Sequence, residues 1–267
     1  MAVQSVDRAI DIVSLISHSS MPLGITEIYK ALKLNKATVF GLVKTMVDRG
    51  LLEQDSETRK YRLGPTMSEW GTARNWSMRI YQAAVYPLRR LSENIQRSAR
   101  LYHWDRGTVM LILNVYHASD RWPFGDVLRP RFPAYSTGAG KAILAWLPEE
   151  ELKEYLKQTE LRALTQNTIT DPKELEADLR SCRERGYSID NEENLKGVKC
   201  LSAPIFDQTA RCVGAVSVNT DLSVLDDNKQ KEVIREVTFT AEEISRSMGY
   251  VRLAQSGGWI TTGKTDG

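Results

Sequence analysis

The segment Gly138–Lys141 combines small residues with a lysine, a composition typical of loops that bind phosphate. A loop of that class also needs a glycine five positions before the second glycine, and a Ser or Thr directly after the lysine. Tyr135 and Ala142 occupy those positions, so a nucleoside-triphosphate loop is excluded. What remains is the start of a helix, where exposed backbone N–H groups and the helix dipole favour an anion such as a carboxylate.

Cys200 is a candidate nucleophile, with the acidic residues of segment 190–194 near it in sequence. A catalytic thiol generally needs a histidine as its base, and the three histidines lie far away in the chain, at His18, His103 and His117. Separation in sequence does not exclude contact, so a hydrolase that uses Cys200 remains an alternative to a small packing residue in a strand. Segment 190–194 has no His or Cys at metal-ligand spacing, and a solvated turn is its simpler interpretation.

A third kind of chemistry, contact with DNA, is indicated by a helix-turn-helix pattern near the N-terminus. Apolar residues recur at helical spacing in Ile25–Lys33 and again in Lys36–Arg49, and Gly50 ends the second helix. Thr26 is a candidate N-cap of the first helix, and Asn35 of the second. A second helix with polar residues at its N-terminal end matches the device that reads a DNA major groove. The alternative is an ordinary helix pair in a core.

A β-hairpin is predicted to follow the helix pair. Two short alternating runs, Leu51–Gln54 and Lys60–Leu63, are joined by a polar turn. Arg59 and Lys60 fall at its tip, where basic side chains suit a DNA phosphate or the minor groove. An amphipathic helix over Ser5–Ser17 is expected to pack behind the pair and complete a three-helix core.

The rest of the chain interleaves helices and strands. Thr66–Arg74 is interpreted as a helical linker, and Ala118–Pro133 as an irregular loop rich in proline and aromatic residues. Helices are predicted over Met78–Ile95, Thr137–Trp146, Glu149–Gln158, Pro172–Arg185 and Asp226–Val251, and strands over Ser98–Trp104, Thr108–His117, Tyr187–Asp190, Val198–Phe206 and Cys212–Asn219. This order predicts a second domain of the α+β or α/β class.

Length and composition fit a two-domain globular protein. With 267 residues, the chain can bury two separate cores. Its net charge of +2 does not by itself indicate nucleic acid. The three cysteines form no CxxC pair, which indicates a reducing compartment. Charged residues near the N-terminus argue against a signal peptide, and no apolar run is long enough to span a bilayer. We therefore expect a cytoplasmic protein without a membrane partner.

Four segments resemble the signature sequences of one protein family. Arg185–Glu193, Gly197–Asp207 and Gly214–Val218 resemble the effector-domain signature of the IclR family of bacterial transcription regulators, and Pro133–Ala142 resembles that family's other hallmark. The resemblance covers about residues 3–250 in the same order and spacing. It implies an N-terminal winged helix-turn-helix and a GAF-like C-terminal domain that binds a small metabolite, often an organic or aromatic acid. It also implies dimers, commonly paired into tetramers, on palindromic operators.

By the same resemblance, one group of residues is expected to bind the effector. The pocket would be bounded by Gly138, Ala139, Asp190, Cys200, Ser217 and Asn219, with an apolar wall from Val198, Phe124 and Phe132. The helix-start N–H groups would then hold a carboxylate, Ser217 and Asn219 would donate hydrogen bonds, and Asp190 would accept one from a hydroxyl. Because Trp122 is also close in sequence, we expect a ligand with a ring or an apolar body rather than a two-carbon acid.

The second helix of the pair departs from the family at one position. The family usually has an arginine just before the paired apolar residues, and Gly41 stands there. Glycine costs about 1 kcal/mol in a helix interior relative to alanine, and it brings no basic side chain to the groove. Contact with DNA would then fall on Asn35, Lys36, Thr38, Phe40, Lys44, Arg59 and Lys60. Phe40 is suited to a thymine methyl group.

These observations predict an α+β chain with a winged helix-turn-helix domain over residues 1–65, a linker helix over 66–77, a GAF-like α/β effector-binding domain over 78–252 and a flexible tail over 253–267. We expect a ligand-responsive, DNA-binding transcription regulator that acts as a homodimer or homotetramer, with no catalytic residue, metal or cofactor. Two alternatives stay open. One is a metabolite-binding hydrolase that uses Cys200. The other is a metabolite sensor whose helix-turn-helix, altered at Gly41, no longer binds DNA, and an interaction of the polyanion type without sequence preference would support it.

Overall fold

The computed structural model describes residues 3–76, 78–105, 107–120, 131–221 and 226–251. These residues form two compact units, the first ending at Trp76 and the second beginning at Met78. Trp122 and Phe124, and the predicted tail over residues 253–267, lie outside the described residues. Among the described helices, none is both long and apolar enough to cross a membrane.

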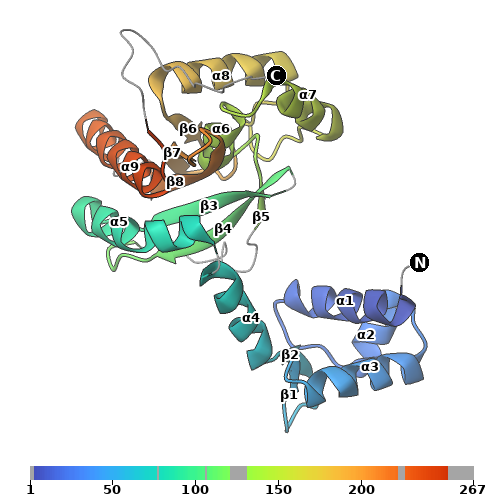
Figure 1. Cartoon of the computed structure of the whole chain (residues 1–267). Coiled ribbons are helices and arrows are strands. Elements are labelled where there is room, and N and C mark those ends of the chain that lie inside the picture. The colour runs from blue at the N-terminus through green and yellow to red at the C-terminus, as the bar shows by residue number, and fades with distance from the viewer. Residues whose placement is uncertain (1–2, 77, 106, 121–130, 222–225, 252–267) are drawn as a thin grey trace, which may run out of the picture. The chain divides into compact units, whose positions relative to one another are not determined.

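The first unit is a winged helix-turn-helix, as predicted. Its elements are α1 (Gln4–Ser17), α2 (Ile25–Leu32), α3 (Lys36–Asp48), β1 (Leu52–Gln54), β2 (Tyr61–Leu63) and α4 (Pro65–Trp76) (Figure 1). The strands β1 and β2 pair antiparallel. Leu23 adds to this wing, because its N–H and C=O bond the main chain of Tyr61 at 3.0 and 2.8 Å.

The core of this unit follows from the helical spacing of α3. Val39, Val43 and Met46 lie on one side of that helix and are buried with apolar residues of α1, α2 and the wing. The predicted N-cap of α3 is confirmed, since Asn35 Oδ1 accepts the Ala37 N–H at 2.8 Å.

The predicted N-cap of α2 was wrong. Thr26 lies inside the helix, and Gly24 is the N-cap. The Gly24 N–H donates to the carboxylate of Glu27 at 2.6 Å, so the side chain in the first turn reaches back to the residue before the helix. A glycine can hold this position because the bonded group at the cap is its backbone N–H.

The second unit is built on a six-stranded antiparallel sheet with the strand order β5-β4-β3-β8-β7-β6. Its strands are β3 (Ala99–Asp105), β4 (Thr108–Val115), β5 (Arg131–Pro133), β6 (Ser188–Asn191), β7 (Val198–Phe206) and β8 (Cys212–Asp221). Its helices are α5 (Arg79–Ile95), α6 (Gly138–Leu144), α7 (Glu149–Gln158), α8 (Pro172–Arg185) and α9 (Asp227–Ser247). This confirms the α+β class and a GAF-like second domain.

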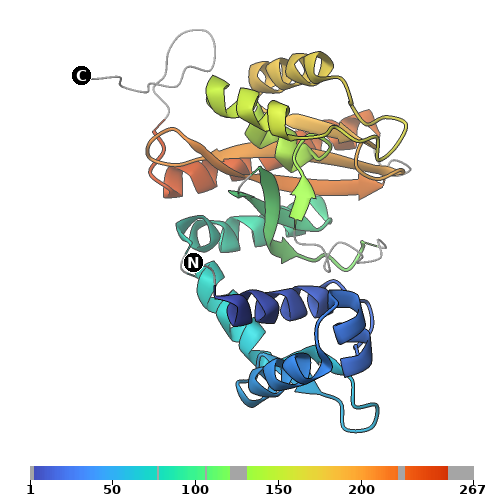
Figure 2. The ribbon, with the colours of Figure 1, turned by 90° about the vertical axis from the view of Figure 1, so that its right-hand side faces the viewer.

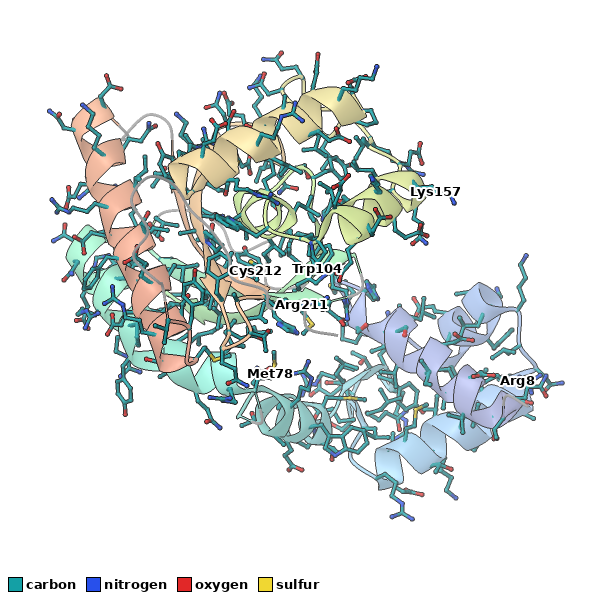
Figure 3. The ribbon with its side chains drawn as sticks, turned by 45° about the horizontal axis from the view of Figure 1, so that its top comes forward. Arg8, Met78, Trp104, Lys157, Arg211 and Cys212 are labelled. Atoms are coloured by element: carbon teal, nitrogen blue, oxygen red, sulfur yellow. The ribbon has the colours of Figure 1, made fainter. Side chains whose placement is uncertain are left out.

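Helices cover both faces of this sheet (Figures 1 and 2). The helices α5 and α9 share one core with the sheet, and α6, α7 and α8 share a second core on the opposite face. Strand β7 therefore contributes side chains to both faces. Leu201 and Ile205 belong to the first core, and the alternate residues Val198, Cys200 and Ser202 point to the opposite face. Cys212 is buried within this unit, while Lys157 near the end of α7 projects outward (Figure 3).

One strand was missed from the sequence. Arg131–Pro133, predicted as part of an irregular loop, forms β5 and pairs with β4 so that Phe132 lies opposite Val109. The strand has only three residues, and proline occurs both within it and directly before it. That composition is typical of loops, and it is tolerated here because β5 is at the edge of the sheet.

Candidate functional site

The outward face of α3 carries the residues predicted to contact DNA. Asn35, Lys36, Phe40 and Lys44 are exposed, and Thr38 is half-buried. The Phe40 side chain is 57 % exposed, which is unusual for a phenylalanine that has a core next to it. The buried residues of α3 lie on its other side, so this helix presents one free face with a cation at each end and an apolar group between them.

The wing presents the two basic residues predicted to contact DNA differently. Arg59 is exposed and has a left-handed backbone with φ 58°, directly after a turn held by Asp55. The Asp55 carboxylate accepts the Thr58 N–H at 2.7 Å and the Thr58 hydroxyl at 2.8 Å, and these bonds lower its pKa. Lys60 lies 3.7 Å from the Glu27 carboxylate, so part of its charge is offset within the unit. Arg59 is therefore the freer cation.

Gly41 has no structural reason to be glycine. It lies on the exposed face of α3 with a helical backbone, and a Cβ added there would meet nothing within 4 Å. We expect Gly41→Ala to stabilise α3 by about 1 kcal/mol, because alanine has the higher helix propensity. The amides of α3 should then exchange with deuterium about fivefold more slowly than in the parent chain. Unchanged exchange in α3 of Gly41→Ala, together with slower exchange in α4 of the control variant Gly71→Ala, would contradict this account.

The predicted effector residues of the second unit fall into two rows across one face of the sheet. One row runs Asp190, Cys200 and Asn219 over β6, β7 and β8. The next row runs Ser188, Ser202, Ser217, Arg100 and Asn114 over β6, β7, β8, β3 and β4. Both rows lie on the face that α6 covers, because the residues between them on β7 and β8 belong to the core under α5 and α9.

Helix α6 packs directly on these rows through Gly138. A Cβ at Gly138 would lie 2.6 Å from Ser202 Oγ and 3.1 Å from Cys200 Cβ, so glycine permits the contact. The Ser188 hydroxyl donates to the Gly138 carbonyl at 2.6 Å. From Ser202, hydroxyl bonds continue to Ser217 at 2.8 Å and on to Asn219 Oδ1 at 3.3 Å. Gly138, Cys200, Ser217 and Asn219 are thereby brought together, while Ala139 follows Gly138 in α6 and Val198 precedes Cys200 by two residues on β7.

Asp190 has structural partners that the sequence did not suggest. Its Oδ1 accepts the N–H groups of Glu193 at 2.7 Å and Asn194 at 3.4 Å, and its carboxylate also bonds the Cys200 thiol. Burial raises the pKa of Asp190, and these hydrogen bonds offset part of that rise. The interpretation of segment 190–194 as a solvated turn was wrong, because Asp190 and Glu193 are both buried.

Lys141 explains how that turn is held. Its ammonium is 1 % exposed and lies 2.5 Å from Glu193 Oε1 and 2.9 Å from Asp178 Oδ2. Burial alone would lower the pKa of Lys141, but the two carboxylates outweigh it and the pKa is raised. The lysine of the rejected phosphate loop is therefore a buried ion-pair partner that ties α6 to α8 and to the turn after β6.

Arg100 is a residue of this face that the sequence analysis did not single out. It is 6 % exposed and lies opposite Ser217 on β8 and opposite Asn114 on β4. Within the described part of the chain, its Nε and Nη1 atoms and the Oδ1 atom of Asn114 are buried without hydrogen-bond partners. The signal was available in the sequence, since Arg100 interrupts an otherwise apolar run between Ala99 and Leu101.

Of the predicted wall residues, Phe132 lies apart from this group. Phe124 lies outside the described residues. Phe132 is at the β5 edge, where its ring meets Tyr102 edge-on at 5.9 Å and lines a separate hollow with Trp104 and Tyr155.

The described contacts of His103 and His117 are with groups other than Cys200. His103 Nδ1 lies 2.9 Å from the Val213 carbonyl oxygen, and His117 Nδ1 lies 2.7 Å from Ser119 Oγ. The thiol of Cys200 bonds Asp190 instead. Over the described ranges there is also no group of three or more His, Cys, Asp or Glu placed to hold a metal ion.

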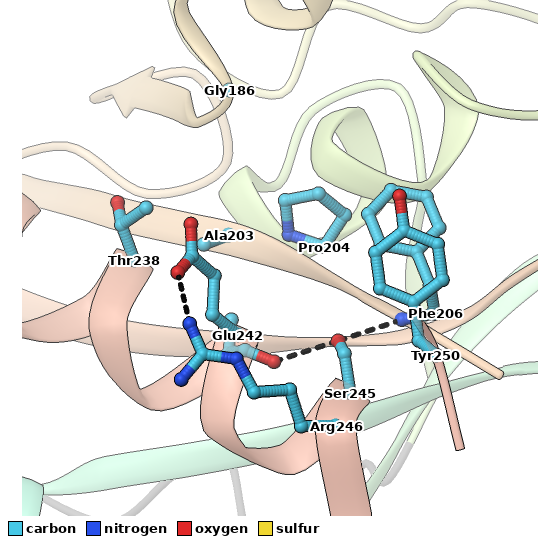
Figure 4. A pocket seen from close by; sticks show the side chains of 10 residues that line it. Gly186, Ala203, Pro204, Phe206, Thr238, Glu242, Ser245, Arg246 and Tyr250 are labelled. Atoms are coloured by element: carbon cyan, nitrogen blue, oxygen red, sulfur yellow. Dashed lines mark hydrogen bonds and ion pairs between the residues drawn. The ribbon is translucent and has the colours of Figure 1, made fainter. Parts of the chain in front are cut away.

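A small apolar cavity lies on the other face of the sheet, between β7 and α9 (Figure 4). Its volume is about 50 Å³, too small for a ring-sized ligand. Its polar groups already have partners, because Ser245 Oγ accepts the Phe206 N–H at 3.0 Å and Arg246 pairs with Glu242 at 3.2 Å. None of the predicted effector residues lines it, and we assign it no function.

Comparison with known proteins bears on both units. Residues 5–56 match the IclR helix-turn-helix domain, and residues 75–246 match the C-terminal domain of the bacterial transcriptional regulator IclR. The chain is 32 % identical to the HTH-type transcriptional regulator XynR of Escherichia coli, over 93 % of this chain and 98 % of that protein.

Two solved structures are similar over most of both chains. The Thermotoga maritima IclR structure has a TM-score of 0.79 and 30 % identity, over 92 % of this chain and 99 % of that one. An IclR homologue from Microbacterium hydrocarbonoxydans, complexed with 4-hydroxybenzoate, has a TM-score of 0.80 and 19 % identity, over 91 % of this chain and 98 % of that one.

Proposed function

The chain belongs to the IclR family of bacterial transcriptional regulators, and from that premise we propose that it binds a palindromic operator as a dimer or tetramer and releases or holds it in response to a small organic acid. The observation that carries the proposal is the free face of α3, with Lys36, Phe40 and Lys44 exposed beside a well-packed core. We assign the boundaries 1–65, 66–77 and 78–252 to the DNA-binding, linker and effector-binding parts.

We propose that α3 enters the major groove and that the wing contacts the backbone. Lys36, Lys44 and Arg59 are suited to phosphates because they are exposed cations, while Phe40 is suited to a thymine methyl. Asn35 and Thr38 flank them at the start of the helix, and Lys60 follows Arg59 on the wing. An effector can change DNA binding if it prefers one spacing between the α3 helices of two copies of the chain. A free-energy preference of about 1–3 kcal/mol is typical of such coupling.

Binding to the promoter region upstream of the chain's own gene tests this, measured by fluorescence anisotropy over a series of salt concentrations. Lys36→Ala should weaken binding to all sequences alike and reduce the salt slope by about 1. Phe40→Ala should relax base preference at one position by about 1–3 kcal/mol. The control is Lys173→Ala, an exposed lysine of α8, which should change neither value. Binding that depends on salt but not on sequence would favour the sensor without operator recognition.

For the effector we propose a carboxylic acid with a ring or apolar body, bound against Gly138, Ala139, Val198, Cys200, Ser217 and Asn219, with Asp190 behind them. Support comes from the way α6, β7 and β8 gather these residues under one helix, and from the 4-hydroxybenzoate held by the Microbacterium homologue. Titration with 4-hydroxybenzoate, benzoate and glyoxylate tests the class. Tight glyoxylate binding with no response to the aromatic acids would contradict the ring.

We propose that the chain is not an enzyme and acts in the cytoplasm. The similar curated proteins are transcription regulators, and Cys200 bonds a carboxylate rather than a histidine. Hydrolysis of a bound ester that disappears in Cys200→Ala would instead establish the hydrolase. Ligand binding without turnover supports the regulator.

A further inference from the structure

A buried arginine for which the described residues supply no counter-ion is the least explained feature of the second unit. Arg100 lies in the second strand row, opposite Ser217, with 6 % of its surface exposed. A guanidinium keeps its charge at any physiological pH and has five N–H donors arranged in a fork. Here Nε and Nη1 are buried and find no acceptor within the described ranges. Such a group is costly to bury, so its retention calls for a ligand.

Three carboxylates described in this unit have partners other than Arg100. Asp190 bonds the amides of its own turn and the Cys200 thiol. Glu193 Oε1 pairs with Lys141 at 2.5 Å. Asp120, the acidic residue after β4, accepts the Ser98 N–H at 2.7 Å and lies 3.9 Å from Arg97. None of these described contacts involves Arg100.

The start of α6 is a weaker anion site than the sequence suggested. The helix has only seven residues, and Thr137 Oγ1 already accepts the Gly140 N–H at 3.2 Å. Both effects reduce what its N-terminus can offer a carboxylate. Arg100 instead brings a full positive charge to this face of the sheet.

We propose that Arg100 binds the carboxylate of the effector along one edge of its guanidinium, either Nε with Nη2 or Nη1 with Nη2, and so selects organic acids over their neutral analogues. This rests on the proposed function, and it names a residue outside the group expected from the family resemblance. A carboxylate fits because its two oxygens match two N–H donors of one guanidinium. Asn219 lies two residues beyond Ser217 on β8, diagonally opposite Arg100 on β3. Asn114, opposite Arg100 on β4, provides Oδ1 as an acceptor for a hydroxyl or N–H of the same ligand.

The test compares the parent chain with Arg100→Met and Arg100→Lys, without DNA. The probes are acetate, glyoxylate, benzoate and 4-hydroxybenzoate, with benzamide and 4-hydroxybenzamide as neutral matches. Calorimetric titration should show at least one carboxylate bound more than tenfold more tightly than its amide. Arg100→Met should remove that difference, and Arg100→Lys should keep only part of it, because an ammonium lacks the fork.

Thermal unfolding gives a second readout that needs no ligand. Methionine fills similar volume without a charge, so Arg100→Met should raise the midpoint of the free protein by about 2–4 °C or more. The matched control is Arg183→Met, because Arg183 has partners: it donates to the Ala145 carbonyl at 2.6 Å and stacks on Trp146. That variant should not gain stability and should bind the carboxylates as the parent does.

Three outcomes would overturn the proposal. The first is that no carboxylate in the series binds the parent chain in preference to its amide. The second is that Arg100→Met binds the carboxylates as tightly as the parent. The third is that Arg100→Met does not raise the midpoint and Asp126→Asn, in a segment outside the described residues, lowers it, because an internal counter-ion pair would lose one buried charge in either variant. Operator binding is measured separately, so its failure would reject the proposed function while leaving the carboxylate result readable.

Discussion

Replacing Lys141 by methionine is expected to lower the free energy of unfolding by about 3–5 kcal/mol. The substitution removes a buried cation and leaves Glu193, which is 5 % exposed, as an uncompensated charge beside it. The second carboxylate oxygen of Glu193, Oε2, already lacks a partner within the described residues, so none of them provides a second cation to replace Lys141. Urea-induced unfolding of the full chain measures the change.

Two further variants separate the ion pair from simple loss of a side chain. Lys141→Met combined with Glu193→Gln should recover part of the loss, because both charges are then gone and the amide oxygen can still accept the Asn191 N–H. Lys153→Met removes a surface lysine that pairs with Glu149 at 2.7 Å, and it should change stability by less than about 0.5 kcal/mol. Equal effects of Lys141→Met and Lys153→Met would show that the buried pair contributes nothing.

The sequence predicted those parts of the fold that rest on local patterns. The helices of the winged unit follow from apolar spacing and from Asn35, and the strands β4, β7 and β8 from runs of β-branched and aliphatic residues. These signals act between neighbours in the chain. The strand β5 has no such signal, because it exists only through its pairing with β4.

The candidate site was harder to predict from the sequence, because the role of each charged residue depends on its contacts with distant segments of the chain. Lys141 looks like part of a phosphate loop until Glu193, 52 residues further on, is seen to pair with it. Segment 190–194 looks solvated for the same reason. Arg100 was missed because an arginine in a strand usually faces solvent, and only the register with Ser217 shows that it faces a covered side of the sheet.

Replacing Gly140 by alanine is expected to destabilise the second unit by about 4 kcal/mol or more, enough to prevent it from folding in a marginally stable chain. A Cβ there would lie 2.1 Å from the carbonyl oxygen and 2.3 Å from the Cα of Ala134. Both atoms belong to the main chain, so no side-chain rotation relieves the overlap, and α6 must move off the segment that leads into it. Gly138→Ala should cost less, about 1–3 kcal/mol, because the nearest atom is the hydroxyl of Ser202, which can rotate.

Gly41→Ala and Gly71→Ala provide the scale for this comparison, since a Cβ at either position meets nothing within 4 Å and both residues lie in helices. The expected order of stability is therefore Gly41→Ala above the parent, then Gly138→Ala, then Gly140→Ala, measured by circular dichroism during urea unfolding. A Gly140→Ala chain within about 1 kcal/mol of the parent would show that α6 can shift without cost. The close packing of α6 on β7 would then no longer explain how Gly138 and Cys200 are held together. The proposed effector-binding residues would have to be positioned by other contacts.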